Sequence, residues 1–201
     1  MTISFDATSN IVNVWRMATP DEKVEGARWY LDAQRDAETI AIRHDVPMIT
    51  VVGVIAALSP NNKWVRNIEN ASTLVAAYMA GDDIESFKVS CYNAMKRKAW
   101  SIMADMITDK AEMLVRLNGR KIQNFARCIW GDGTSVCVDG HARNIAYAER
   151  IGLTDSRTNI GVREYRFLTD SYNEAAAIVG VPGYVMQAVT WTVWRRVHGI
   201  T

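Results

Sequence analysis

The amino-acid sequence predicts an all-α protein, and three observations carry that prediction. A helix start stands at Thr19-Pro20-Asp21-Glu22, where a threonine cap precedes a proline and a glutamate follows three residues after the cap. The almost wholly apolar run Met48 to Leu58 is longer than a typical strand. Glycine and proline clusters such as Gly180-Val181-Pro182-Gly183 separate segments in which apolar side chains recur at helical spacing.

The N-terminal part of the chain holds three predicted helices. The first spans Pro20 to about His44, because apolar side chains recur at helical spacing after the cap. The second, 48–58, follows Pro47, a residue suited to the first helical position, although its β-branched residues also fit a strand. The run Ser59-Pro60-Asn61-Asn62 interrupts the chain, and a third helix continues to about Ala80.

Six more helices are predicted in the rest of the chain, separated by turn residues or a short extended step. A tight turn at Leu117-Asn118-Gly119 and an extended apolar step at Val136-Cys137-Val138 are the clearest breaks. We expect about nine or ten helices in one compact domain over residues 1–201, without repeats or linkers. The six helices are expected at about 90–105, 109–116, 120–130, 139–151, 161–179 and 183–197.

Composition excludes several classes of protein. An apolar fraction of 49% and a charged fraction of 22% argue against a disordered, collagen-like or coiled-coil chain. There is no apolar stretch of about 18 residues, and Met1 to Asn10 lacks the pattern of a signal peptide, so no membrane contact is expected. The three cysteines Cys91, Cys128 and Cys137 are widely spaced, which suits a reducing cytoplasm and excludes a four-cysteine metal cluster within one chain.

Charge is distributed unevenly along the chain. Residues 1–87 carry 7 basic and 12 acidic side chains, whereas residues 88–201 carry 16 basic and 10 acidic ones. The C-terminal part therefore favours contact with a polyanion, although solvated helix faces also produce asymmetry of this size.

The most informative segment is residues 117–146, in which a turn is followed by two predicted helices. Lys121 lies in the first turn of one helix, where the dipole disfavours an ammonium group and favours the neutral amine that a lysine nucleophile needs. Asp139 caps the next helix, where backbone N–H groups hold a carboxylate ionised and able to stabilise a sugar cation. Each residue alone also fits a structural reading, as an ordinary N-cap or a solvated lysine.

These residues resemble the helix-hairpin-helix DNA glycosylase superfamily, and its endonuclease III-like branch in particular. In that family a hairpin LPGVGRKTA precedes a VDTH motif at the spacing seen here between Gly119-Arg120-Lys121 and Val138-Asp139-Gly140-His141. Val51 to Asn67 resembles the family's apolar helix ending in LLSAQ, and Lys88 to Ala99 resembles its GLYNSKA segment. The matches fall in family order over roughly residues 45–150.

The resemblance implies a two-lobed helical fold with a helix-hairpin-helix element, its hairpin and catalytic segment at about 109–150, and DNA as the partner. Lys121 would attack C1′ and form a Schiff base, and Asp139 would assist formation of the sugar cation or activate the nucleophile. The base would be flipped into a pocket between the lobes. The loop residues Asn61, Asn62, Lys63 and Trp64 would fill the gap in the DNA or read the base, although Trp64 equally fits a packing role.

Two departures from the family pattern stand out. The hairpin's leading Leu-Pro-Gly is replaced by Val115-Arg116-Leu117, so Gly119 is the one hairpin glycine that remains for backbone contact with a phosphate. The cysteine-rich tail that binds an iron–sulfur cluster is absent, so no cofactor or metal is predicted. The pattern is typical of divergent proteins of phage and mobile elements.

Other candidate contacts are weaker. His141 would bind a phosphate or orient Asp139, and it equally fits a structural histidine of its own helix. Arg143 and the cluster Lys96-Arg97-Lys98 are candidate phosphate contacts, or ordinary solvated charges. One face of the last helix would line a base pocket, although a tryptophan stripe at this spacing is more often core packing. That face comprises Gln187, Trp191, Trp194 and Arg195.

The sequence therefore predicts a DNA-base-processing enzyme that cleaves an N-glycosidic bond, with lysine-dependent lyase activity. One alternative is a phage DNA-hypermodification enzyme that transfers an amino acid or amine onto activated 5-hydroxymethyluracil in DNA. A second is a non-catalytic DNA-binding protein, and a third is a helical interaction module without a DNA partner. We expect a cytoplasmic location, in the host if the chain is viral, and the sequence predicts no oligomeric state.

Overall fold

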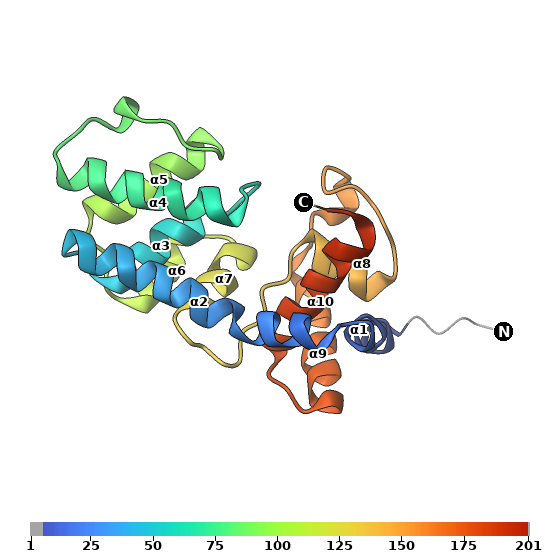
Figure 1. Ribbon diagram of the computed structural model, residues 1–201. Helices are drawn as coiled ribbons and strands as arrows, with labels where there is room; N and C mark the ends of the chain where they lie inside the picture. The colour runs from blue at the N-terminus through green and yellow to red at the C-terminus, as the bar shows by residue number, and fades with distance from the viewer. Residues whose placement is uncertain (1–5, 201) are drawn as a thin grey trace. The chain divides into compact units, whose positions relative to one another are not determined.

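The computed structural model describes residues 6–200, which contain ten α-helices, two short 3-10 helices and no strand (Figure 1). The all-α prediction is confirmed. The chain divides into two compact units: unit 1 combines the chain up to Tyr30 with the chain from Asp132 onward, and unit 2 is the continuous stretch Leu31–Gly131. The helix α2 (Pro20–His44) contributes its first part to unit 1 and its second part to unit 2.

Unit 2 is built around α3 (Met48–Leu58), whose side chains from Thr50 to Leu58 are all buried. Such a helix is apolar all round because neighbours cover every face. The helices α4 (Trp64–Met79), α5 (Asn93–Ala104), α6 (Lys110–Leu117) and α7 (Arg120–Ile129) pack against it. A short 3-10 helix, Ile84–Ser86, lies between α4 and α5.

In unit 1 the helices α1 (Ala7–Arg16), α8 (Gly140–Tyr147), α9 (Val162–Val179) and α10 (Gly183–His198) pack together. The first part of α2 is bonded to α10 through Glu22 and Tyr30. A second 3-10 helix, Ser156–Thr158, precedes α9. The core includes the fully buried side chains of Ile11, Leu168 and Tyr172. No single helix in the described part is long and apolar enough to cross a membrane, and only the bent pair α9 and α10 meets that criterion jointly.

The predicted start of α2 is confirmed in detail. The Thr19 hydroxyl accepts from the Glu22 backbone N–H at 3.2 Å, and the Glu22 carboxylate accepts from the Thr19 N–H at 2.8 Å. The two residues thereby form a reciprocal capping box. Glu22 also pairs with Arg196 of α10, with an Nε–Oε1 distance of 2.6 Å.

Three predicted boundaries were wrong. The helix predicted for 90–105 begins at Asn93, because Lys96 bonds back to the Phe87 carbonyl and fixes the preceding chain outside the helix. The helix predicted to reach Ile151 ends at Tyr147, where Ala148 takes a left-handed conformation and the Asn144 amide bonds to the Ile151 carbonyl at 2.8 Å. Leu117 of the predicted turn belongs to α6. The sequence reading also omitted α1.

Candidate functional site

The helices α6 and α7 form a tight helical hairpin. The link consists of Asn118 and Gly119 alone, and Asn118 takes the left-handed conformation with φ 45° and ψ 63°. Asparagine tolerates this conformation better than most residues, and its backbone N–H bonds to the Leu114 carbonyl at 3.2 Å. Asn118 therefore makes the left-handed turn between α6 and α7.

Side chains from both neighbouring helices pin the end of α6. The Lys98 amine of α5 donates to the carbonyl of Leu117, and the Gln123 amide of α7 donates to the carbonyl of Leu114 at 2.6 Å. Partial burial lowers the pKa of Lys98. The bond from Lys98 satisfies a carbonyl that the end of a helix otherwise leaves unpaired, and the bond from Gln123 adds a second donor to the Leu114 carbonyl. The hairpin is therefore a defined structural element.

Lys121 is the second residue of α7 and is half-buried. The first backbone bond of α7 runs from the Gln123 N–H to the Gly119 carbonyl at 2.8 Å, and Gly119 has no side chain to cap the helix. The backbone groups at this end carry the positive pole of the helix. Neither α5 nor α7 contains an acidic residue, and α7 begins with the exposed Arg120.

Asp139 is the N-cap of α8, as predicted, and its Oδ1 accepts from the Ala142 N–H at 2.8 Å. Its Oδ2 has no hydrogen-bond partner among residues 6–200. The preceding extended step is held by Tyr165, whose hydroxyl donates to the Val136 carbonyl at 3.0 Å and accepts from the Val138 N–H at 3.1 Å. Asp139 is thus half-buried on a fixed backbone, with one oxygen available.

The loop after α3 presents Asn61. The Asn62 amide donates to the Leu58 carbonyl at 3.1 Å, and the Asn67 amide donates to the Ile55 carbonyl at the same distance, so both asparagines cap α3. Asn61 is exposed and left-handed, with φ 54°. Lys63 is exposed at the N-cap of α4. Asn61 and Lys63 are thus the accessible members of the predicted loop set.

Trp64 is half-buried and fixed on two sides within unit 2. Its ring packs edge-on against Phe125 of α7, with centroids 6.2 Å apart. Its side chain also hydrogen-bonds the Asp36 carboxylate of α2. These contacts favour the packing role over insertion into DNA. Phe125 stands four residues after Lys121, so Trp64 supports the helix that carries the predicted nucleophile.

His141 lies close enough to His198 and Arg150 for their charges to interact. Burial lowers the pKa of His198, and the positive charges of Arg150 and His141 lower it further. His198 also packs against Trp194, with ring centroids 3.9 Å apart, and its carbonyl accepts from Arg150 at 3.1 Å. This group gives unit 1 a local concentration of cationic and imidazole side chains.

Arg143 is buried and bonded inside unit 1. Its guanidinium pairs with Glu164 at 3.1 Å and Glu149 at 3.3 Å, and it stacks over the Tyr147 ring at 4.3 Å. Two carboxylates thus neutralise its charge, which favours a structural role over the predicted phosphate contact. Of the cluster 96–98, only Arg97 is exposed, because Lys96 bonds the Phe87 carbonyl and Lys98 bonds the hairpin.

The predicted face of α10 is split between core and surface. Gln187 is buried and accepts from the Tyr30 hydroxyl at 3.0 Å, and Trp194 is buried as well. Trp191 and Arg195 are half-buried and form a cation–π contact at 4.5 Å. The packing interpretation therefore fits Gln187 and Trp194, whereas Trp191 and Arg195 remain partly accessible.

The predicted residues are distributed over both units. Unit 2 carries the loop residues, the hairpin and Lys121, and unit 1 carries Asp139, His141 and the face of α10. Sequence reasoning missed Asp36, Tyr165 and Lys98 as supporting residues, because nothing in their local pattern signals a long-range partner. Within residues 6–200, no group of three or more His, Cys, Asp or Glu residues is arranged to hold a metal ion.

Comparison with known proteins gave one result. A family model described as a family of unknown function, DUF7178, matches residues 3–198. No curated protein and no solved structure matches the chain.

Proposed function

The chain belongs to the DUF7178 family, and from its own residues we propose that it is a DNA-base-processing enzyme that cleaves an N-glycosidic bond with lysine-dependent lyase activity. The observation that carries the proposal is the α6–α7 hairpin with Lys121 in its first helical turn, combined with Asp139 at the start of α8. These are the positions at which the helix-hairpin-helix DNA glycosylases, which this sequence resembles, carry their lysine and aspartate.

The hairpin supports contact with a DNA phosphate. The N-terminus of α7 has no side-chain cap, so its N–H groups are oriented toward an incoming anion. Arg120 is exposed beside it, and Arg97 of α5 is a further exposed cation in the same unit. Contacts of this kind position DNA without reading its sequence.

The chemistry requires a neutral amine at Lys121. Its Nζ would attack C1′ of the target nucleotide, the C1′–N bond would break, and the base would leave with a proton. Opening of the sugar ring gives a Schiff base between Nζ and C1′, and β-elimination then breaks the C3′–O bond. Asp139 would stabilise positive charge on the sugar through its Oδ2.

Borohydride trapping tests the proposal, because reduction converts the Schiff base into a stable covalent protein–DNA adduct. The substrates are duplexes carrying uracil, an oxidised pyrimidine, 5-hydroxymethyluracil, 8-oxoguanine or an abasic site. We expect a trapped band for wild type and for Lys88→Ala, which removes an exposed lysine from the same unit, and no band for Lys121→Ala.

Three outcomes would redirect the assignment. Absence of a wild-type band on every duplex, the abasic one included, would exclude the Schiff-base route. Release of pyrophosphate from DNA bearing pyrophosphorylated 5-hydroxymethyluracil would then identify the transferase alternative. DNA binding that is unchanged in the double variant Lys121→Ala, Asp139→Asn, without turnover by wild type, would identify a non-catalytic binder.

A further inference from the structure

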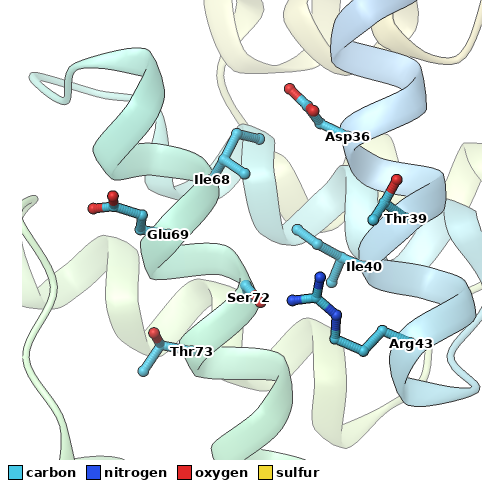
Figure 2. A pocket seen from close by; sticks show the side chains of 8 residues that line it. All are labelled: Asp36, Thr39, Ile40, Arg43, Ile68, Glu69, Ser72 and Thr73. Atoms are coloured by element: carbon cyan, nitrogen blue, oxygen red, sulfur yellow. The ribbon is translucent and has the colours of Figure 1, made fainter.

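A groove of about 380 Å³ lies between α2 and α4 on unit 2 (Figure 2). Its α2 side carries Asp36, Ile40 and Arg43, and its α4 side carries Ile68 and Ser72. The side chains of Asp36, Ile40, Arg43 and Ile68 point into the space between the two helices in Figure 2. The volume falls in the range of small-molecule sites. Two isoleucines, Ile40 and Ile68, lie among polar and charged lining residues.

Three charged side chains line this groove, Asp36, Arg43 and Glu69, and none of them forms an ion pair within the described residues. Glu69 points away from α2 in Figure 2, so Asp36 and Arg43 are the charges that face the space between the helices. Arg43 makes no hydrogen bond or ion pair with any residue of 6–200, whereas Arg116, Arg157 and Arg196 all pair with carboxylates. Asp36 accepts a hydrogen bond from Trp64 but pairs with no cation in the same range.

Asp36 is also partly desolvated. Burial raises its pKa, the bond from Trp64 opposes that shift, and the negative charge of Asp32 raises it again. A partly buried carboxylate without a cation is stabilised when a ligand supplies one. Arg43 offers the opposite charge at the other end of the groove, where its guanidinium reaches toward Ser72 (Figure 2).

The spacing defines the length of a complementary ligand. Asp36 and Arg43 are seven residues apart on one helix, which places them on the same face and about 10 Å apart along its axis. Ile40 stands between them and is buried, and Ile68 faces it from α4. Along α2 the groove thus presents a carboxylate, an isoleucine and a guanidinium in that order, with Ile68 opposite the isoleucine.

We propose that this groove binds a linear zwitterion, with a primary amine at Asp36, a carboxylate at Arg43 and an aliphatic chain over Ile40 and Ile68. The proposal concerns a site separate from the DNA chemistry and does not depend on it. An amine–carboxylate contact and an Arg–carboxylate contact are both charge-assisted, so the two ends contribute independently.

Titration of the ¹⁵N-labelled full chain with 6-aminohexanoate, followed by amide chemical shifts, tests the proposal. Hexylamine lacks the carboxylate, hexanoate lacks the amine, and glycine is too short to reach both ends. We expect 6-aminohexanoate to bind about tenfold more tightly than each of the three, since one charge-assisted contact accounts for such a ratio. Its shifts should centre on residues 36–43 and 68–73.

Two substitutions assign the ends. In Asp36→Asn the amide oxygen still accepts the Trp64 bond, so the fold is preserved while the charge is lost; 6-aminohexanoate should then bind no better than hexanoate. In Arg43→Gln it should bind no better than hexylamine. Glu38→Gln, which removes an exposed charge of α2 outside the groove, should leave the preference intact.

Several results would overturn the proposal. Equal binding of 6-aminohexanoate and hexylamine by wild type would mean that the groove recognises a cation alone. Shifts centred outside α2 and α4, or an undiminished preference in both substituted proteins, would exclude this groove as the site. No shift with any of the four compounds would exclude a zwitterion site altogether.

Discussion

The Lys98 amine of α5 donates a hydrogen bond to the backbone carbonyl of Leu117, the last residue of α6. Leu117 is the residue before the turn between α6 and α7. The bond from Lys98 therefore ties α5 to the hairpin that carries Lys121. The bond satisfies a carbonyl at the end of α6 and so stabilises the turn between α6 and α7.

Replacing Lys98 by methionine removes this bond and keeps most of the apolar volume. We expect Lys98→Met to lower the free energy of unfolding by about 1 kcal/mol, the typical worth of one such hydrogen bond. Amide hydrogen exchange at Asn118 and Gly119 should accelerate more than exchange in α3. The exposed Lys88→Met serves as control, and an equal effect of both substitutions would contradict a specific role for Lys98.

Two substitutions at Asp139 separate its structural and catalytic roles. Asp139→Ala removes the N-cap of α8 and should lower the free energy of unfolding by about 1 kcal/mol. Asp139→Asn keeps a good cap and removes the negative charge, so its stability should match wild type while turnover of a DNA substrate is lost. Denaturant unfolding measures the first effect and borohydride trapping the second. If Asp139→Asn turned over the DNA substrate at the wild-type rate, the carboxylate would have no catalytic role, and Asp139 would serve only as the N-cap of α8.

Gly26 lies where α2 approaches α10 closely. A Cβ at this position would stand 2.8 Å from both the Cα and the backbone nitrogen of Val189, and backbone atoms cannot move aside as a side-chain tip can. We expect Gly26→Ala to lower the free energy of unfolding by about 1–3 kcal/mol despite the better helix propensity of alanine. Thermal unfolding of both variants measures the effect. Gly133→Ala, whose Cβ would meet nothing within 4 Å, should leave the free energy of unfolding close to that of wild type.

The ion pair of Glu22 with Arg196 predicts a pH dependence. The hydrogen bond from Arg196 lowers the pKa of Glu22 below its ordinary value of 4.5, against the effect of burial. A depressed carboxyl pKa stabilises the fold above the unfolded pKa, and that stability is lost as pH falls through the folded pKa. Glu22→Gln retains the capping box, so it should be less stable than wild type at pH 7 and approach wild type below pH of about 4. A constant difference across that range would contradict the prediction.

Helices with strong local signals could be predicted from the sequence. Hydrogen-bond and ion-pair partners that are distant in the sequence could not. The capping box at Thr19 and the apolar run of α3 depend on neighbouring residues, and both predictions were confirmed. The local signal for α1 is weaker: Asp6 caps the helix by accepting from the Ser9 N–H, and Ile11 and Trp15 form its buried face.

Among the site residues, accessibility was the property that local pattern could not supply. Arg143 and Gln187 stand at positions that suit a binding face, but Glu164 and Tyr30, distant in sequence, occupy their polar groups. Asp139 as an N-cap was predictable because its partner is Ala142, within the same turn. The availability of its Oδ2 depends on the packing around it, which no local pattern encodes.

The order in which the chain is synthesised determines when each of the two units can fold. Unit 2 is one uninterrupted stretch, so every residue it needs has been synthesised once Gly131 has been added. Unit 1 combines two stretches separated by unit 2, so α1 has no α9 or α10 to pack against until residues 162–198 have been synthesised. The apolar side chains of α1 are therefore made more than a hundred residues before the helices that cover them, and the charges of Asp6 and Arg16 flank them.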